Sequence, residues 1–384
     1  MRRNAWWLLS ALLVLSACRP SKTDRPIDRE ALVGRRTPRL TAFDVLSPLS
    51  VGNGSLVFTA DATGLQTFPG SYEAFAPLRT QCTAIPSAYQ PERLHIGMNF
   101  DNNVGTEQIS DVRQSLDMWN GMLDSRFMYA GSEFTVQTVC HPKQPLIGFS
   151  VDSRMFAGIR FRFDVDTLHV ARLLRLSAPD AVFEQVNYTD TARTDSTVYY
   201  LSVRWEGEAG LREEAPGAFV LKPRVPAYSL VCRYSADEPP LQQRLPDYST
   251  VAVASSEYWH SFWTNGAVYD FLFCTDPRAP ELERRIVCTQ YAAAIRKELD
   301  HAITQLSEPY QVAIDAVRQG EPDKAIDALL SDDHAGANLP TDNGLLSAIA
   351  LMCADREENS TPLPGFPKDG KWSVRWSAAA PDKK

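Results

Sequence analysis

The residues best suited to chemistry lie in one segment, EYWHSFWTNGAVYDF, at positions 257–271. A sugar presents C–H groups to a flat aromatic ring, and its hydroxyl groups need paired hydrogen-bond donors and acceptors. Trp259 and Trp263 are four residues apart, so they share a face in either a helix or a strand. We therefore expect a carbohydrate-binding platform facing a cleft, although aromatic packing between domains would explain the same residues. The candidate binding residues are Trp259, His260, Trp263, Asn265 and Asp270.

Hydrolysis of a glycosidic bond would need two carboxyl groups, roughly 5–5.5 Å apart for retention or 6.5–9.5 Å for inversion. Glu257, Asp270 and Asp276 are candidates by location only. Asp276 precedes Pro277, a pair typical of a helix start, so it is better explained as a helix cap, and Glu257 is better explained as a solvated residue near a strand end. The sequence therefore defines no catalytic pair.

The remaining motifs predict neither a metal site nor a cofactor. The histidines are scattered, and the cysteines after Cys18 show no CxxC spacing, so we expect most of them to be small buried residues, with disulfides left open. Gly52-Asn53-Gly54 is a turn signal and lacks the spacing of a phosphate-binding loop.

The N-terminus predicts export and a lipid anchor. Arg2 and Arg3 precede an apolar stretch that is too short to span a bilayer, and Leu15-Ser16-Ala17-Cys18 fits a bacterial lipobox. We expect lipidation of Cys18 and, because Arg19 follows it, an outer-membrane location. An ordinary signal peptide with an incidental cysteine is the alternative. The predicted signal peptide is 1–18, and a polar, proline-containing tether follows at 19–39.

Composition excludes several classes of protein. The chain of 384 residues is 44% hydrophobic and 22% charged, which is ordinary for a globular protein. Its net charge of −8, with no long basic block, gives nucleic-acid binding no electrostatic support.

Short strands dominate the predicted domain at 40–274. The segment AGIRFRFDV at 157–165 alternates apolar and charged residues, which indicates a half-buried strand. One helix or turn is plausible around 108–120. Further strands are expected at 134–140, 146–151, 197–205, 228–234 and 250–255. Many strands without regular helices between them favour an antiparallel sandwich.

A second domain is predicted at 275–384, where the pattern becomes helical. Leu282, Ile286, Tyr291 and later apolar residues recur at helical spacing, which predicts one amphipathic helix over 277–306. Shorter helices are expected at 311–319, 323–331 and 345–354.

Long motifs in the same order resemble a known family of proteins. They are IDREALVGRRTPRLTAFDVLSPLSVGNGSLVFTADATGLQTFP (27–69), SDVRQSLDMWNGMLDSRF (110–127), VQTVCHP (136–142), YWHSFWTNGAVYDFLFCTDPRAPELERRIVCTQY (258–291), NGLLSAIALMCA (343–354) and GFPKDGKWSVRW (365–376). These segments resemble bacterial six-hairpin glycosidases similar to glycoside hydrolase family 65. The resemblance implies an N-terminal antiparallel β-supersandwich followed by a helical domain derived from an (α/α)6 barrel, a mixed β and α fold.

The chain departs from that family where the barrel should be. Only 51 residues, 292–342, separate the motif that ends at Tyr291 from the motif that begins at Asn343. Twelve helices need well over ~150 residues, so the barrel cannot close. The family's catalytic carboxylates lie in that missing part. With the lipobox, this partial resemblance predicts a surface lipoprotein of carbohydrate metabolism that binds an oligosaccharide or glycan with reduced or no hydrolysis. The alternatives are a structural or interaction protein without a sugar site, and an internal deletion that leaves a marginal fold.

Overall fold

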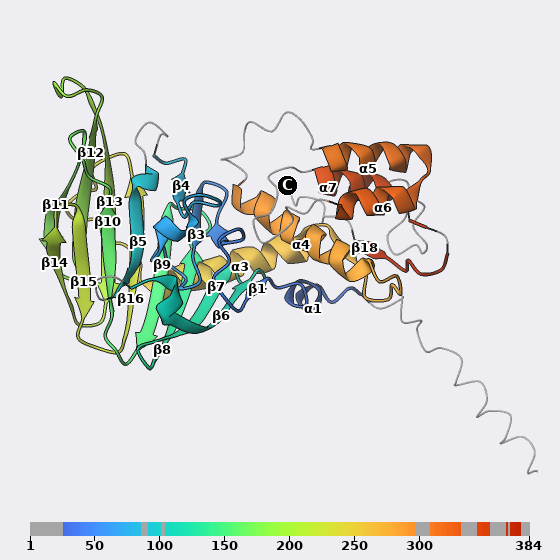
Figure 1. Cartoon of the computed structure of the whole chain (residues 1–384), viewed down its shortest axis with the longest axis horizontal. Coiled ribbons are helices and arrows are strands. Elements are labelled where there is room, and N and C mark those ends of the chain that lie inside the picture. The colour runs from blue at the N-terminus through green and yellow to red at the C-terminus, as the bar shows by residue number, and fades with distance from the viewer. Residues whose placement is uncertain are drawn as a thin grey trace, which may run out of the picture.

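The computed structural model describes residues 26–85, 91–100, 104–296, 308–331, 344–353, 366–367 and 369–377. These residues form a β-sandwich and a smaller cluster of helices, joined by two long helices (Figure 1). The expected mixed fold, an antiparallel sandwich followed by a partial helical domain, is confirmed. The predicted signal peptide, Cys18 and residues 19–25 of the predicted tether lie outside the described residues. The rest of the predicted tether, 26–39, is folded: it contains a short helix at Arg29–Gly34 with Leu32 and Val33 buried, and it reaches an edge strand at Arg39.

The sandwich packs one large sheet against two smaller ones. The described strands of the large sheet run in the order β1-β6-β7-β8-β9-β16-β13-β12-β11, with every neighbouring pair antiparallel. Their bounds are β1 (Arg39–Leu40), β6 (Ile109–Asp117), β7 (Met122–Tyr129), β8 (Ser132–Cys140), β9 (Leu146–Ser153), β11 (His169–Ser177), β12 (Asp180–Tyr188), β13 (Ser196–Glu206) and β16 (Ala227–Ser235).

The smaller sheets cover the inner face of the large sheet. One has the order β14-β15-β10-β5 and the other β2-β3-β4. Their bounds are β2 (Leu49–Gly52), β3 (Leu56–Ala60), β4 (Thr80–Cys82), β5 (Leu94–Asn99), β10 (Gly158–Phe163), β14 (Ala209–Ala215) and β15 (Ala218–Pro223). Alternation places Phe161 and Phe163 of β10 in the core against Phe183 of β12, as the sequence pattern predicts.

One predicted helix is a strand. The segment around 108–120 forms β6, although its buried residues Ile109, Val112 and Leu116 have helix-like spacing. The register shifts between Ser110 and Arg113, so a β-bulge adds residues to the strand and breaks the alternation. The bulge therefore gives a strand the apolar spacing of a helix.

One predicted strand is a helix. The segment at 250–255 lies within α3 (Tyr248–Asn265) despite its β-forming valines. Asp247 caps the helix by accepting a hydrogen bond from the Thr250 amide at 2.7 Å. Val251, Ser255, Trp259 and Trp263 then recur every four residues on the buried face. Packing of that stripe against the sheet overrides the local propensity.

The helical cluster follows the predicted order of short helices. The remaining helices are α1 (Arg29–Gly34), α2 (Pro69–Tyr72), α4 (Ala279–Arg296), α5 (Glu308–Gln319), α6 (Pro322–Leu330) and α7 (Gly344–Cys353), and two short 3₁₀ turns span Pro91–Arg93 and Thr106–Gln108. A two-stranded sheet pairs β17 (Val268–Asp270) with β18 (Arg375–Ser377). The long helix begins at 279 instead of 277, and its predicted end lies outside the described residues.

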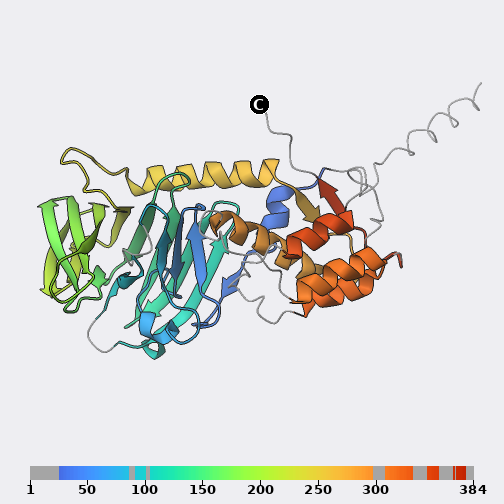
Figure 2. The ribbon, with the colours of Figure 1, turned by 90° about the horizontal axis from the view of Figure 1, so that it is seen from above.

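Helix α4 belongs to two hydrophobic cores. Leu282 and Ile286 pack in the helical cluster, whereas Tyr291 and Ile295 pack in the sandwich. The predicted domain boundary between 274 and 275 therefore stays a prediction. Figure 2 shows α3 lying along the sandwich and reaching the helical cluster. None of the described helices is both long and apolar enough to cross a bilayer.

Candidate functional site

The two predicted platform tryptophans are part of the core. Trp259 and Trp263 lie on the buried face of α3 and are 2% and 1% exposed. The Trp259 ring stacks on Tyr291 of α4 with centroids 4.5 Å apart. The Trp263 indole nitrogen donates to the Met118 carbonyl at 2.7 Å. The expectation of an exposed indole platform is therefore wrong, because both rings pack between the sheet and the helices.

A glycine allows this close packing. Gly121, in the turn between β6 and β7, has a φ of +65°, and a Cβ atom there would lie 2.0 Å from the Trp259 ring. Ser255 also donates to the Asn120 carbonyl of the same turn at 3.0 Å. Helix α3 is thus fixed on the β6–β7 turn by shape and by hydrogen bonds.

His260 and Asn265 do not join the tryptophans in one site. The His260 ring is half-buried, lies against Trp119, and has Nε2 3.0 Å from the Asn120 side-chain oxygen. Asn265 is exposed at the end of α3 and donates to the Ser261 carbonyl at 2.9 Å. The structure therefore separates these two residues, and His260 contacts the β6–β7 turn.

Asp270 is a structural counterion. Its side chain is buried and pairs with Arg35 of the N-terminal segment and Arg375 of β18. Arg35 also donates to the fully buried Glu283 of α4 at 2.6 Å and 3.0 Å, and Arg36 pairs with the same carboxylate. A buried carboxylate is stable only with such partners. The expectation that Asp270 contacts a ligand is therefore wrong.

The other predicted carboxylates do not form a pair. Glu257 is exposed on α3. Asp276 is bound to Arg278 at 3.0 Å and accepts from the Arg278 amide, and this arginine lowers the pKa of the Asp276 carboxyl. Among the described residues, no group of three or more His, Cys, Asp or Glu side chains could hold a metal ion. The described cysteines are free thiols, most of them buried.

The open part of the large sheet carries a candidate site that the sequence analysis missed. The outer face of β7, β8 and β9 is covered by α3 at one end, where Val139, Leu146 and Val251 form a small apolar cluster. Further along the same strands the outward residues are mostly polar and are exposed or half-buried. A hollow of about 550 Å³ lies there. We call it the Glu133 hollow; it is lined by Met128, Gly131, Ser132, Glu133, Thr135, Asp152, Ser153 and Arg154.

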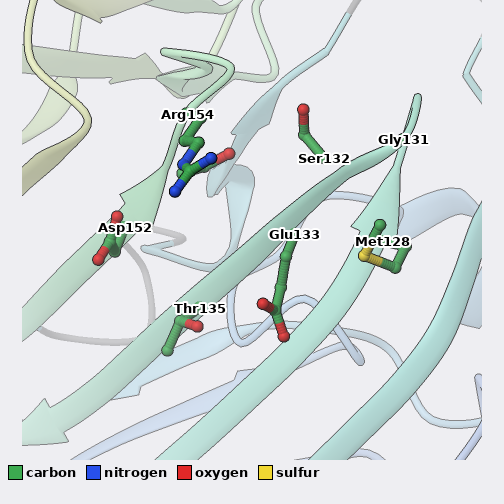
Figure 3. Close-up of a pocket in the computed structure, with 8 residues that line it drawn as sticks. Met128, Gly131, Ser132, Glu133, Thr135, Asp152 and Arg154 are labelled. Atoms are coloured by element: carbon green, nitrogen blue, oxygen red, sulfur yellow. The ribbon is translucent and has the colours of Figure 1, made fainter.

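Strand register places the polar groups of this hollow side by side. Thr135 of β8 lies directly opposite Asp152 of β9, and Glu133 is two residues from Thr135 on the same face. Figure 3 shows Glu133, Thr135 and Asp152 projecting from the two strands, with Arg154 just beyond the end of β9. Two carboxylates, a hydroxyl and a guanidinium therefore offer both acceptors and donors around one open space.

The signal for this face was present in the sequence. Residues 134–140 begin with core-facing apolar residues that alternate with outward polar residues, and this alternation predicts the strand. The polar residues between them are the ones that line the hollow. Nothing in their types distinguishes them from an ordinary solvated strand face, so only the register of β8 and β9 brings Glu133 and Asp152 together.

A buried carboxylate lies on the inner side of the same sheet. Asp61 is fully buried, and burial raises the pKa of its carboxyl to about 6. Hydrogen bonds from the Thr63 and Phe68 amides, each 2.8 Å, oppose that rise. Gln114 of β6 donates to the Asp61 carbonyl at 2.7 Å. Asp61 therefore holds the loop that follows β3 in place, and it is not accessible to a ligand.

The fold is similar to parts of solved structures of sugar-active enzymes, at sequence identities of 7–10%. No protein-family model and no curated protein matches the sequence. A solved structure described as a kojibiose phosphorylase from the human microbiome is 10% identical, with a TM-score of 0.44 over 67% of this chain and 42% of that chain. A family 92 α-mannosidase from Bacteroides thetaiotaomicron is 7% identical, with a TM-score of 0.34 over 70% and 40%.

A family 81 glycoside hydrolase from Clostridium thermocellum is 8% identical, with a TM-score of 0.30 over 59% of this chain and 26% of that chain. This chain spans less than half the length of each of these structures. At such scores the likenesses assign no activity, substrate or site to it.

Proposed function

We propose that this chain is a glycosidase-related protein that binds carbohydrate in the Glu133 hollow and has little or no hydrolytic activity. The observation that carries the proposal is the set of donors and acceptors around one open space: the exposed Glu133, Asp152 and Arg154 and the half-buried Thr135. Sugar hydroxyl groups require such a mixed set of partners. The resemblance of the sequence motifs to six-hairpin glycosidases supports the choice of carbohydrate as the ligand.

The same geometry argues against efficient hydrolysis. A general acid needs a carboxyl group that is shielded from water and held on the scissile bond by a rigid cavity. Glu133 and Asp152 are both exposed on an open sheet face. Asp270 and Asp276 are already bound by arginines. We therefore expect no turnover in the usual enzyme range of ~1–10³ s⁻¹ with α-glucosides, or with disaccharides and phosphate.

The test of binding is a glycan array probed with the purified full chain, followed by titration calorimetry on the sugars that bind. The double variant Glu133→Gln, Asp152→Asn should lose this binding. Glu257→Gln is the matched control, because it removes an exposed carboxylate from α3. An empty array, or a double variant that binds like the parent chain, would overturn the proposal and favour a structural or interaction protein.

The proposal includes a lipid anchor at the outer membrane. Its support is the lipobox Leu15-Ser16-Ala17-Cys18 behind an apolar segment of signal-peptide length. Metabolic labelling with a fatty-acid analogue should mark the parent chain and be lost in Cys18→Ser. Labelling that persists in this variant, or a mature N-terminus at another residue, would contradict the anchor without affecting the binding test.

A further inference from the structure

A second hollow lies on the same outer face, at the edge formed by β1, β6 and β7. Its volume is about 500 Å³. It is lined by Arg39, Leu40, Thr41, Arg113, Gln114, Ser115, Asp124 and Arg126. We call it the Arg126 hollow. Three exposed guanidinium groups, those of Arg39, Arg113 and Arg126, therefore surround one open space.

The register of the sheet forces two of these positive charges together. Arg113 of β6 lies directly opposite Arg126 of β7, and Arg39 of β1 lies opposite Ser115, two residues further along β6. Like charges in directly opposite positions destabilise a sheet. The pair of opposite arginines therefore lowers the stability of the sheet, and no contact within the described structure compensates for it.

The hollow keeps a net positive charge, because three arginines face the single carboxylate of Asp124 in its lining. Asp124, which lines the hollow, accepts a hydrogen bond from Gln137 at 2.9 Å. Asp111 is exposed in the bulge that precedes Arg113. Across the part of the chain that the structure describes, none of the three arginines takes part in an ion pair, whereas exposed arginines elsewhere on the sandwich, such as Arg212 and Arg224, do.

The overall charge makes this contrast sharper. The chain carries a net charge of −8, so a group of free arginines on its surface is a local exception. Arginine presents a planar set of donors that fits carboxylate, sulfate and phosphate groups. The chemistry of the Arg126 hollow is therefore that of an oxyanion site.

The two hollows adjoin along β7. Arg126 lines one and Met128 lines the other, and these residues are neighbours on the same face of the strand, about 7 Å apart. Thr135 of the Glu133 hollow lies directly opposite Arg126. One elongated ligand can therefore contact both hollows across β7 without reaching the end of the sheet face that α3 covers.

We infer that the ligand is an acidic glycan, whose hydroxyl groups occupy the Glu133 hollow and whose carboxylate, sulfate or phosphate group occupies the Arg126 hollow. This inference rests on the proposed function for the first hollow and adds the charge class of the sugar. The arginines in one hollow and the carboxylates in the other also orient the bound glycan, because Glu133 and Asp152 repel its anionic group.

The experiment compares sulfated and unsulfated dextran oligosaccharides of equal length, titrated into the full chain at low salt. We expect the sulfated form to bind about tenfold more tightly, since hydrogen bonds to charged groups are the stronger ones. The double variant Arg113→Gln, Arg126→Gln should lose this preference, and added salt should weaken it. Arg224→Gln is the control, because it removes a positive charge from an exposed arginine outside the hollow.

The outcomes separate the two proposals. Equal binding of both oligosaccharides, lost in Glu133→Gln, Asp152→Asn, would overturn the acidic-glycan inference and leave the proposed function intact. A sulfate preference that survives the arginine double variant would also overturn the inference. Sulfate-dependent binding that needs the arginines and not the carboxylates would support the oxyanion site and contradict the role of the Glu133 hollow.

Discussion

Strands β6 to β9 present two very different faces. On the inner face, the buried polar side chains are bound within the protein: Thr138 donates to the Gly64 carbonyl at 2.6 Å, and Gln114 donates to Ser125 at 2.9 Å. On the outer face, beyond the end covered by α3, Glu133 and Arg126 are exposed. The difference shows that burial separates polar residues that specify the fold from those that are free to bind a ligand.

The aromatic residues follow the same division. Trp259 and Trp263 have the side chains expected of a sugar platform, yet they lie on the buried face of α3 and are removed from solvent. The open part of the face, where a ligand has access, is rich in charge and poor in rings. Residue type alone therefore points to the covered part of this face, and accessibility points to the part proposed to bind a ligand.

The largest effect is expected from Trp263→Ala, which tests the covered end of the outer face. Loss of a buried tryptophan and of its hydrogen bond to Met118 should lower the free energy of unfolding by about 3–5 kcal/mol. Val253→Ala, on the exposed side of the same helix, should change it by less than about 0.5 kcal/mol. Chemical denaturation measures both. If Trp263→Ala left the stability unchanged and altered glycan binding, the glycan site would lie at the end of the face that α3 covers and not in the Glu133 hollow.

The next largest effect is expected in the pH dependence of stability, from Asp61 on the inner side of the large sheet. Because the pKa of its carboxyl is raised to about 6 in the folded chain, the folded state keeps a proton that the unfolded state loses near pH 4. This contribution to stability is present below about pH 4 and is lost as the pH rises through 6. Between pH 4 and 7, the unfolding free energy of Asp61→Asn should therefore rise by about 2 kcal/mol relative to that of the parent chain.

Urea denaturation at pH 4 and pH 7 measures this change. Asp152→Asn serves as the control, because its exposed carboxylate on the outer face should leave the pH profile parallel to that of the parent chain. Parallel profiles for the parent chain and Asp61→Asn would show that Asp61 ionises like a solvated residue, and the contrast between the two faces would fail for this group.

The smallest effect comes from two threonines on opposite faces of β8. Thr138→Val removes a buried hydroxyl and leaves the Gly64 carbonyl without that donor, which should cost about 1–2 kcal/mol of unfolding free energy. Thr135→Val, on the open face, should stay within about 0.5 kcal/mol. Thermal and urea unfolding of this matched pair gives the difference directly. Equal costs would mean that the outer face contributes to stability as the core does.

The sequence supports the prediction of most strands and of the short helices, because alternation and helical spacing reflect burial directly. Phe161 and Phe163 alternate with arginines, and they fill the core as expected. The wrong predictions arise where tertiary structure overrides the local sequence pattern. The bulge in β6 gives a strand the apolar spacing of a helix, and packing against the sheet makes the valine-rich start of α3 helical.

The candidate site is harder to predict for a different reason. Glu133 and Asp152 are 19 positions apart in the chain, and Arg113 and Arg126 belong to different strands. Their proximity depends on register, which is fixed by the turns and by the bulge before Arg113. The resemblance to glycosidases indicated carbohydrate but directed attention to the aromatic segment, since that segment carries the family's motifs.

The ionic cluster of Arg35, Arg36, Asp270, Glu283 and Arg375 has a mechanical consequence. It fastens the short helix α1 to β17, to α4 and to β18, while Arg29 donates to the Trp263 and Gly266 carbonyls at the end of α3. A tether attached at the proposed anchor, Cys18, would pull first on α1. The load would then pass into several elements at once instead of peeling β1 from the edge of the sheet, so the Arg126 hollow beside β1 would keep its shape under tension.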